Sequence, residues 1–139
     1  MTIRELKKVE VTMDEKDKTY RVIIAGSRDF TDYEQLKVQC NRLLSEKDVA
    51  HRIVILSGMA RGTDSLAVRY AHEKDYALEE YPAHWETGGK RAGVIRNAEM
   101  AATADALIAF WDGNSKGTYD MITKARKKGL AVRVIRIKC

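Results

Sequence analysis

The chain has 139 residues, of which 45% are hydrophobic and 32% charged, and its formal net charge is +5; this balance is typical of one soluble globular domain. No apolar run approaches the roughly 20 residues that span a bilayer, and residues 1–20 lack the apolar stretch of a signal peptide, so we expect a cytoplasmic protein with no membrane partner. The two cysteines, Cys40 and Cys139, give neither a disulfide framework nor a metal-ligand spacing, and we expect no metal site.

Strand and helix patterns alternate along the chain. Residues 1–18 are predicted to form a charged arm with a short strand at 8–13, and residues 19–139 a single domain. Thr31 or Asp32 caps the first helix, and Gly129 ends the last one. The predicted elements in chain order are a strand at 21–25, a helix at 32–47, a strand at 52–56, a helix at 63–74, a strand at 77–81, a helix at 91–103, a strand at 106–111, a helix at 118–128 and a strand at 130–137.

This alternation indicates βαβ units, and right-handed crossovers between parallel strands place helices on both faces of a sheet. We therefore predict an α/β fold, a Rossmann-like three-layer sandwich with a mostly parallel five-stranded sheet. Sheets of this kind bind ligands beyond the carboxyl ends of their strands. The site is accordingly expected at residues 26–32, 57–64, 82–91 and 112–118.

Glycine-rich polar turns occupy those positions. Glycine lets backbone approach a ligand, arginine binds anions through charge-assisted hydrogen bonds, and the first N–H groups of a helix form an anion site. One such turn is commonly only a turn and a cap, but three on one sheet edge favour a phosphate-bearing ligand. The predicted ligand-binding residues in these turns are Gly26, Ser27 and Arg28, then Ser57, Gly58, Arg61, Gly62 and Asp64, then Gly117 and Thr118. Neither a P-loop lysine motif nor a G-x-G-x-x-G fingerprint is present, which disfavours ATP hydrolysis and dinucleotide redox chemistry.

The segment from Trp85 to Asn97 is the most unusual in the chain, because it joins a tryptophan to glycines and cations. Trp85 is predicted either to stack on a base or to cover the core as a loop residue. Arg96 and Asn97 lie in an otherwise apolar helix, where a charge needs a partner that an anionic ligand or Glu99 would supply. His84, beside Trp85, is the histidine placed nearest the pocket.

Residues 124–138 contain seven basic and no acidic side chains. A tract of this kind attracts nucleic acid. We favour the alternative, a solvated helix end with lysines at the negative end of the helix dipole, followed by a strand that carries Arg133 and Arg136. No helix shows a strongly apolar exposed face in the sequence, which leaves the oligomeric state open.

The ordered set of these motifs resembles the YspA-like branch of the SLOG superfamily, to which the Lonely Guy phosphoribohydrolases and the DNA-processing protein DprA also belong. The resemblance covers residues 20–138 and runs from Gly26-Ser27-Arg28 to Gly117-Thr118. It implies a Rossmann-like sheet and a pocket for nucleotides or nucleotide-derived signals. It also implies a modest preference for a homodimer.

The Lonely Guy enzymes test whether the resemblance extends to catalysis. Arg96 matches their helical arginine, and Gly117-Thr118 matches the Gly-Thr of their P-G-G-x-G-T-x-x-E motif. The Pro-Gly-Gly of that motif is missing here, and the glutamate position holds Met121, with Asp120 one residue earlier. One residue along a helix turns a side chain by about 100°. If the protein is a hydrolase, Arg96, Asp120 and Glu86 are the expected catalytic residues, with Asp64 as a further substitute for the missing glutamate.

Three functions follow, in order of preference. The first is a binding or sensing module for a nucleotide-like small molecule, without a defined cofactor. The second is a nucleoside 5′-monophosphate phosphoribohydrolase, which cleaves an N-glycosidic bond. The third is a single-stranded nucleic-acid binder that resembles DprA, for which the chain offers few aromatic side chains to stack on bases.

Overall fold

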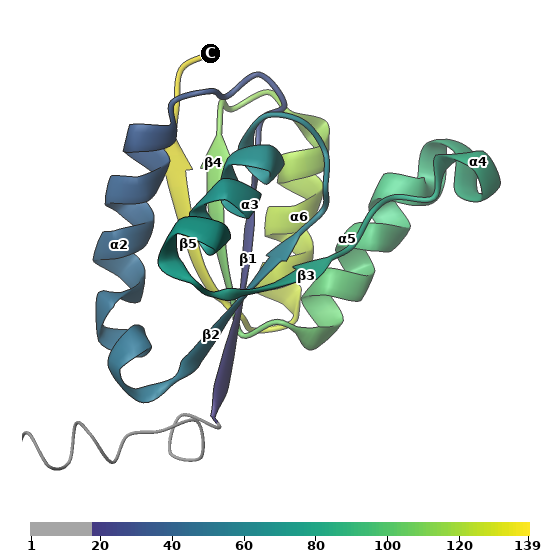
Figure 1. Cartoon of the computed structure of the whole chain (residues 1–139). Helices are drawn as coiled ribbons and strands as arrows, with labels where there is room; N and C mark the ends of the chain where they lie inside the picture. Colours follow the sequence, from purple (N-terminus) through teal and green to yellow (C-terminus); the bar gives the residue numbers. More distant parts are fainter. Residues whose placement is uncertain (1–17) are drawn as a thin grey trace, which may run out of the picture.

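A computed structural model describes residues 18–139 as five parallel strands with helices on both faces (Figure 1). The sheet order is β3-β2-β1-β4-β5, and every neighbouring pair is parallel. This confirms the predicted Rossmann-like α/β sandwich and makes its sheet fully parallel. The strands are β1 (Thr19–Gly26), β2 (Arg52–Ser57), β3 (Ala77–Glu80), β4 (Ala106–Trp111) and β5 (Ala131–Arg136).

The helices divide between the two faces of the sheet. One core joins the strands to α2 and α3, and the other joins them to α5 and α6. Cys40 is fully buried in the first core. The helices are α2 (Tyr33–Ala50), α3 (Thr63–Lys74), α4 (Trp85–Gly88), α5 (Ala92–Thr103) and α6 (Lys116–Lys127), with a short 3₁₀ turn, η2 (Gly89–Arg91), before α5.

The predicted elements are all present in the described residues, and the differences lie at their ends. Asp32 caps α2 because its Oδ1 accepts a hydrogen bond from Gln35 N at 3.1 Å, and the helix continues to Ala50 instead of ending near 47. Ser115 caps α6, so that helix begins two residues before the expected start at Thr118. The turns α4 and η2 lie where the sequence predicted a loop. The predicted strand at 8–13 falls outside the described residues.

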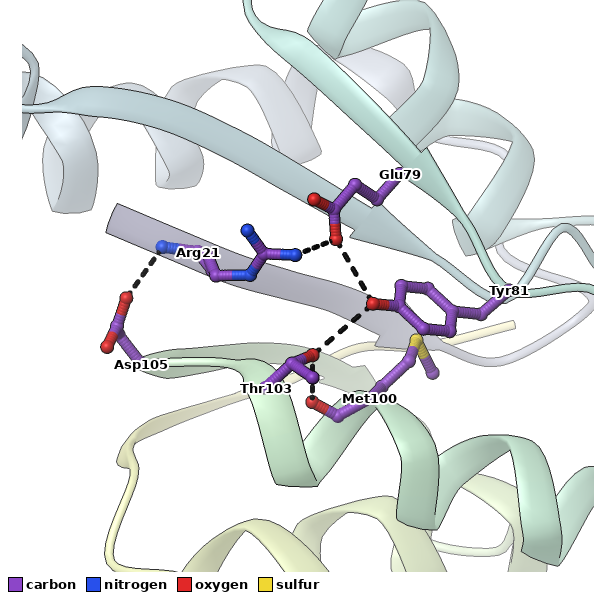
Figure 2. Close-up of polar contacts among 6 residues, drawn as sticks. All are labelled: Arg21, Glu79, Tyr81, Met100, Thr103 and Asp105. Atoms are coloured by element: carbon purple, nitrogen blue, oxygen red, sulfur yellow. Dashed lines mark hydrogen bonds and ion pairs between the residues drawn. The ribbon is translucent and has the colours of Figure 1, made fainter. Parts of the chain in front are cut away.

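A polar network fixes the end of α5 against the sheet (Figure 2). Arg21 on β1 forms an ion pair with Glu79 on β3, and Glu79 Oε1 also accepts a hydrogen bond from the Tyr81 hydroxyl at 3.1 Å. The same hydroxyl lies 3.3 Å from Thr103 Oγ1 at the last residue of α5, and Asp105 Oδ2 accepts from Arg21 N at 2.9 Å. Because α5 carries two predicted site residues, this network helps to set where they lie.

Within residues 18–139, none of the helices is long and apolar enough to cross a membrane.

Candidate functional site

A hollow of about 250 Å³ lies beyond the carboxyl ends of β1 and β4, between the first turn of α6 and the N-terminal half of α5. This is the sheet edge at which the sequence predicted the site. Four cationic and two acidic side chains line it, so its charge favours an anion. The predicted site residues that line the hollow are Gly26, Arg28, Asp64, Trp85, Arg96, Asn97, Gly117, Thr118 and Asp120.

Arg96 is held by acceptors on three sides. Its Nη1 donates to Gly58 O at 2.6 Å and to Tyr81 O at 3.5 Å, and its Nε donates to Asn97 Oδ1 at 3.0 Å. Burial lowers the pKa of Arg96 from its ordinary value, whereas the nearby Asp64 carboxylate acts in the opposite direction. The guanidinium is therefore a partly desolvated, oriented cation in the wall of the hollow.

Gly58 makes room for this guanidinium. A Cβ at position 58 would lie 2.3 Å from Arg96 Nη1 and 2.9 Å from Asp64 Oδ2, closer than real Cβ contacts come. The glycine therefore serves close packing of a charged side chain and does not itself line the hollow.

Asn97 links α5 to α6. Its Nδ2 donates to Gly117 O at 3.2 Å and to Asp120 Oδ2 at 3.0 Å, while Asp120 Oδ1 accepts from Lys124 Nζ at 2.5 Å. Both carboxylate oxygens of Asp120 are thus already engaged by the protein. The carboxylate whose charge acts on Arg96 is Asp64, and not Glu99, which the sequence analysis considered.

Asp64 is the second carboxylate in the wall. It is buried, and its Oδ2 accepts a hydrogen bond from Ala60 N at 3.1 Å. Burial raises the pKa of Asp64 above its ordinary value, and that hydrogen bond together with the charges of Arg96 and Arg28 opposes the rise. The residue offers a hydrogen-bond acceptor inside the hollow.

Trp85 and Arg28 form the outer part of the site. The Arg28 guanidinium lies 5.9 Å from the centre of the Trp85 ring, a cation–π distance, and Trp85 is 48% exposed. A Cβ on Gly93 would lie 3.2 Å from Trp85 Cη2, so the indole rests against the α5 backbone. One edge of the ring is packed, and much of its surface is free for a ligand.

The first turn of α6 closes the opposite side. Asp112 Oδ1 accepts hydrogen bonds from Asn114 N and Ser115 N, both at 2.8 Å, and these bonds lower the pKa of Asp112. Lys116 and Gly117 belong to the turn whose N–H groups have no partner inside the helix, and both line the hollow.

The chain itself uses part of the start of α3, where the sequence predicted an anion site. Thr63 N and Thr63 Oγ1 both donate to Ser27 O, at 3.1 and 2.9 Å, so these two donors are not free for a ligand. Gly62 adopts a positive φ of 73°, and a Cβ at this position would lie 2.3 Å from the Arg28 carbonyl oxygen. Glycine is therefore required by this turn, whether or not a ligand binds there.

Several predicted residues do not line the hollow, for different physical reasons. Ser27 and Ser57 are buried and hold turns, because Ser27 Oγ accepts from Asp29 N and Ser57 Oγ donates to Asp64 O. Arg61 is exposed and lies 3.6 Å from Asp29 in an ion pair. The set outside the lining is Ser27, Ser57, Gly58, Arg61, Gly62 and Glu86.

Glu86 and His84 also lie elsewhere. Glu86 is an exposed residue of α4, so the structure does not bring it to the other two predicted catalytic residues. His84 lines a separate hollow of about 150 Å³ together with Pro82 and Glu99. Within residues 18–139, no His, Cys, Asp and Glu side chains gather in a group of three or more that could hold a metal ion.

Sequence reasoning missed part of the lining. Lys90 and Lys116 are cations in segments that the sequence singled out, and their charge was the signal that could have found them. Met100 and Met121 form apolar wall, and no sequence signal separates them from other core residues. Met121 stands at the position of the missing glutamate and is buried at the hollow.

The chain is similar to known proteins in sequence. A family model described as YspA, cpYpsA-related SLOG family matches residues 20–88. The Gene 61 protein of Mycobacterium phage D29 is 36% identical over 122 residues, which cover 81% of this chain and 93% of the phage protein.

Solved structures share the fold at low sequence identity. DprA of Streptococcus pneumoniae superposes with a TM-score of 0.66 at 17% identity over 91% of this chain, which spans 53% of that protein, about half its length. DprA of Helicobacter pylori, described for its single-stranded DNA binding mode, gives 0.60 at 20% identity, covering 91% of this chain and 70% of that one. TM1055, a structural genomics target, gives 0.60 at 17% identity, covering 81% and 72%. These likenesses support the fold alone.

Proposed function

The chain belongs to the YspA, cpYpsA-related SLOG family, and from that premise we propose that it binds a nucleotide or a nucleotide-derived phosphate in the hollow between α5 and α6. The phosphate lies against Arg28, Arg96 and the first turn of α6. The base lies against the exposed surface of Trp85.

The observation that carries this proposal is the state of Arg96. A partly buried guanidinium loses hydration, and the protein compensates it with backbone carbonyls and one carboxylate. The wall of the hollow also holds Arg28, Lys90 and Lys116, so cations outnumber carboxylates there. A phosphate dianion supplies the charge that this arrangement lacks, through strong charge-assisted hydrogen bonds.

The first turn of α6 adds a second attraction. Helix N-termini favour anions through their unpaired N–H groups and the helix dipole. Gly117 carries no Cβ that would hold a phosphate away. The Ser115 and Thr118 hydroxyls line the same wall but contact each other at 3.0 Å. Charge and backbone donors therefore converge on one anionic group.

Hydrolysis of an N-glycosidic bond is the second candidate, because Arg96 and Asp120 both line the hollow. A general acid or base must have an oxygen free to reach the proton it transfers. Asp120 instead accepts from Asn97 and Lys124, and the glutamate position is Met121. These contacts favour binding over turnover. Release of free base and ribose 5-phosphate from a nucleoside monophosphate, abolished in Asp120→Asn, would reverse that preference.

Single-stranded nucleic acid is the third candidate, and one exposed cluster favours it. The Trp111 and Tyr119 rings lie 5.9 Å apart, and the Arg136 guanidinium lies 5.9 Å from the centre of the Trp111 ring. Tyr119 is 59% exposed, as a stacking platform for a base requires. Binding of an oligothymidylate that weakens steeply with salt and in Tyr119→Ala would support this role.

The proposal is tested by calorimetric titration with a panel of mononucleotides, dinucleotides, cyclic nucleotides and ribose 5-phosphate. Arg28→Ala is the main variant, because Arg28 is exposed and its loss leaves the core intact. We expect about a tenfold or larger loss of affinity, the effect of one charge-assisted contact.

Arg42→Ala is the matched control, since Arg42 is an exposed arginine on α2, away from the hollow. Arg96→Lys should bind more weakly than wild type, because a lysine keeps the charge and loses the fork that engages Gly58 and Asn97. Unchanged affinity in Arg28→Ala and Arg96→Lys, with Arg42→Ala behaving likewise, would reject the pocket assignment.

A further inference from the structure

Asp64 has one carboxylate oxygen that the described chain does not use. The side chain is buried and lines the hollow between α5 and α6, and its Oδ2 accepts from Ala60 N at 3.1 Å. Within residues 18–139, no hydrogen bond reaches its Oδ1. In the same range, the side-chain atoms that are enclosed and lack a partner are Arg21 Nε and Arg52 Nε, so Asp64 Oδ1 is not enclosed. This oxygen can therefore accept a hydrogen bond from a molecule in the hollow.

Asp120, the other carboxylate that lines the hollow, offers no such acceptor. Its Oδ2 accepts from Asn97 Nδ2 and its Oδ1 from Lys124 Nζ. A donor group on a ligand therefore finds its carboxylate partner at Asp64. The two aspartates form a matched pair, because they carry the same group in the same hollow and differ in whether an oxygen is free.

The charges of the hollow decide which kind of donor Asp64 accepts from. Four cations line the same walls, and they would repel a cationic group on a ligand. The Asp64 carboxylate, in turn, would repel a phosphate. A neutral donor suits both conditions. Burial strengthens the requirement, since a carboxylate with little access to water is costly when one of its acceptors has no partner.

The position of Asp64 in the fold places it beside the middle of a bound nucleotide. Asp64 lies in the first turn of α3, after β2, whereas the first turn of α6 follows β4. Strands β2 and β4 flank β1, so their axes are about 10 Å apart. A phosphate on the α6 turn therefore leaves Asp64 to a different part of the same ligand. With the base against Trp85, the sugar lies between base and phosphate, and its hydroxyls are neutral donors.

We propose that Asp64 Oδ1 accepts a hydrogen bond from the 2′-hydroxyl of the sugar, so that the site selects ribonucleotides over deoxyribonucleotides. This inference rests on the function proposed above and extends it by naming the sugar. Of the two ring hydroxyls, the 2′-hydroxyl is farther from a 5′-phosphate, which keeps the phosphate away from the carboxylate. Acidic side chains bind the same hydroxyl in dinucleotide-binding folds.

The test compares ribose 5-phosphate with 2-deoxyribose 5-phosphate by calorimetric titration of the full chain, because the two probes differ only at this hydroxyl and carry no base. Wild type should bind ribose 5-phosphate about ten- to hundredfold more tightly, the effect of one hydrogen bond to a charged group. Asp64→Asn should remove most of this preference, since an amide oxygen that still faces Ala60 N leaves an N–H donor where Oδ1 stood.

Asp120→Asn is the matched control, and it should keep the wild-type ratio of the two dissociation constants, because Asp120 has no free oxygen to lose. That ratio does not depend on the folded fraction of a sample, so a change in it reports on recognition and not on folding. Asp64→Ser is a second variant, which keeps a hydroxyl near Ala60 N but shortens the side chain, and it should lose the preference as well.

Adenosine 5′-monophosphate and its two deoxy analogues identify the hydroxyl. The 2′-deoxy analogue should bind more weakly than the 3′-deoxy analogue, and the reverse order would overturn the assignment to the 2′-hydroxyl. Equal binding of the two sugar phosphates by wild type, or an unchanged ratio in both Asp64 variants, would overturn the inference and leave the proposed function in place. If neither ribose 5-phosphate nor any of the four common ribonucleoside 5′-monophosphates binds to wild type, the proposed function fails and this inference fails with it.

Discussion

Arg96 Nη1 donates to the carbonyl oxygen of Gly58 at 2.6 Å, and this hydrogen bond joins α5 to the turn that follows β2. The contact exists because position 58 has no side chain. A Cβ there would lie 2.3 Å from the same nitrogen, and the guanidinium would have to leave its acceptors. The absence of a side chain at Gly58 thus allows Arg96 to keep its orientation.

Gly58→Ala should therefore weaken ligand binding more than it weakens the fold. The nearest atoms are the ends of the Arg96 and Asp64 side chains, which can move, so we expect a stability loss of about 1–3 kcal/mol, typical of overpacking. Ligand affinity should fall at least about tenfold, because Arg96 loses its orientation. Urea unfolding and calorimetric titration of the same samples measure both. An unfolded variant or an unchanged affinity would contradict the prediction.

Gly117→Ala tests the first turn of α6 by the same chemical change. A Cβ at position 117 meets nothing within 4 Å, so the fold tolerates it, and alanine favours the helix over glycine by up to about 1 kcal/mol. Thermal unfolding should show an equal or higher midpoint. If a phosphate packs on this turn, the added methyl group lowers its affinity while the protein becomes no less stable. Equal affinity for wild type and variant would place the phosphate elsewhere in the hollow.

Tyr81→Phe tests whether the polar network of Figure 2 affects stability without affecting ligand binding. The hydroxyl donates to Glu79 and lies near Thr103, whereas the Tyr81 contact to Arg96 comes from the backbone and survives the change. We expect a loss of about 0.5–1.5 kcal/mol, the usual contribution of one hydrogen bond. Denaturant unfolding measures this loss, and ligand affinity should remain at the wild-type value. A large affinity loss would mean that the network positions α5 more tightly than its geometry indicates.

The sheet was predictable from sequence because the central strands contain short β-branched apolar runs between turn residues, as in 22–25, 53–56 and 106–110. The run at 106–111 and the helix at 63–74 coincide with the observed β4 and α3. Errors arose where a side chain outside the periodic pattern sets the boundary. Ser115 starts α6 through its hydroxyl contact with Thr118 N, and no hydrophobic period reports such a cap.

The site was predictable in place but not in detail. Strand ends of a parallel sheet converge at one edge, so Arg28, Arg96 and Gly117 come together as the order of elements requires. The sequence does not reveal which polar groups the chain uses for itself. Ser27 O occupies the donors of Thr63, and Asn97 and Lys124 occupy both oxygens of Asp120, through contacts between residues far apart in the chain or on different helix turns.

Asp64→Asn should change how stability depends on pH. Burial raises the pKa of Asp64 above 3.8, so the folded state holds this proton more tightly than the unfolded state. As pH rises from about 3.8, the unfolded chain releases the proton first, and stability falls until the folded carboxyl also ionises. Above that pH the destabilisation from burying the ionised carboxylate is complete and constant.

Asparagine keeps an acceptor for Ala60 N and has no charge to bury. The variant should therefore gain stability relative to wild type as pH rises through this window and then hold a constant difference. The attraction between the ionised carboxylate and Arg96 is already contained in the net rise of the Asp64 pKa, because wild type carries that anion only where the carboxyl is ionised. Denaturant unfolding of both proteins at a series of pH values measures the difference. A difference that grows on acidification would show that the charges of Arg96 and Arg28 outweigh burial and hold the pKa of Asp64 below its ordinary value.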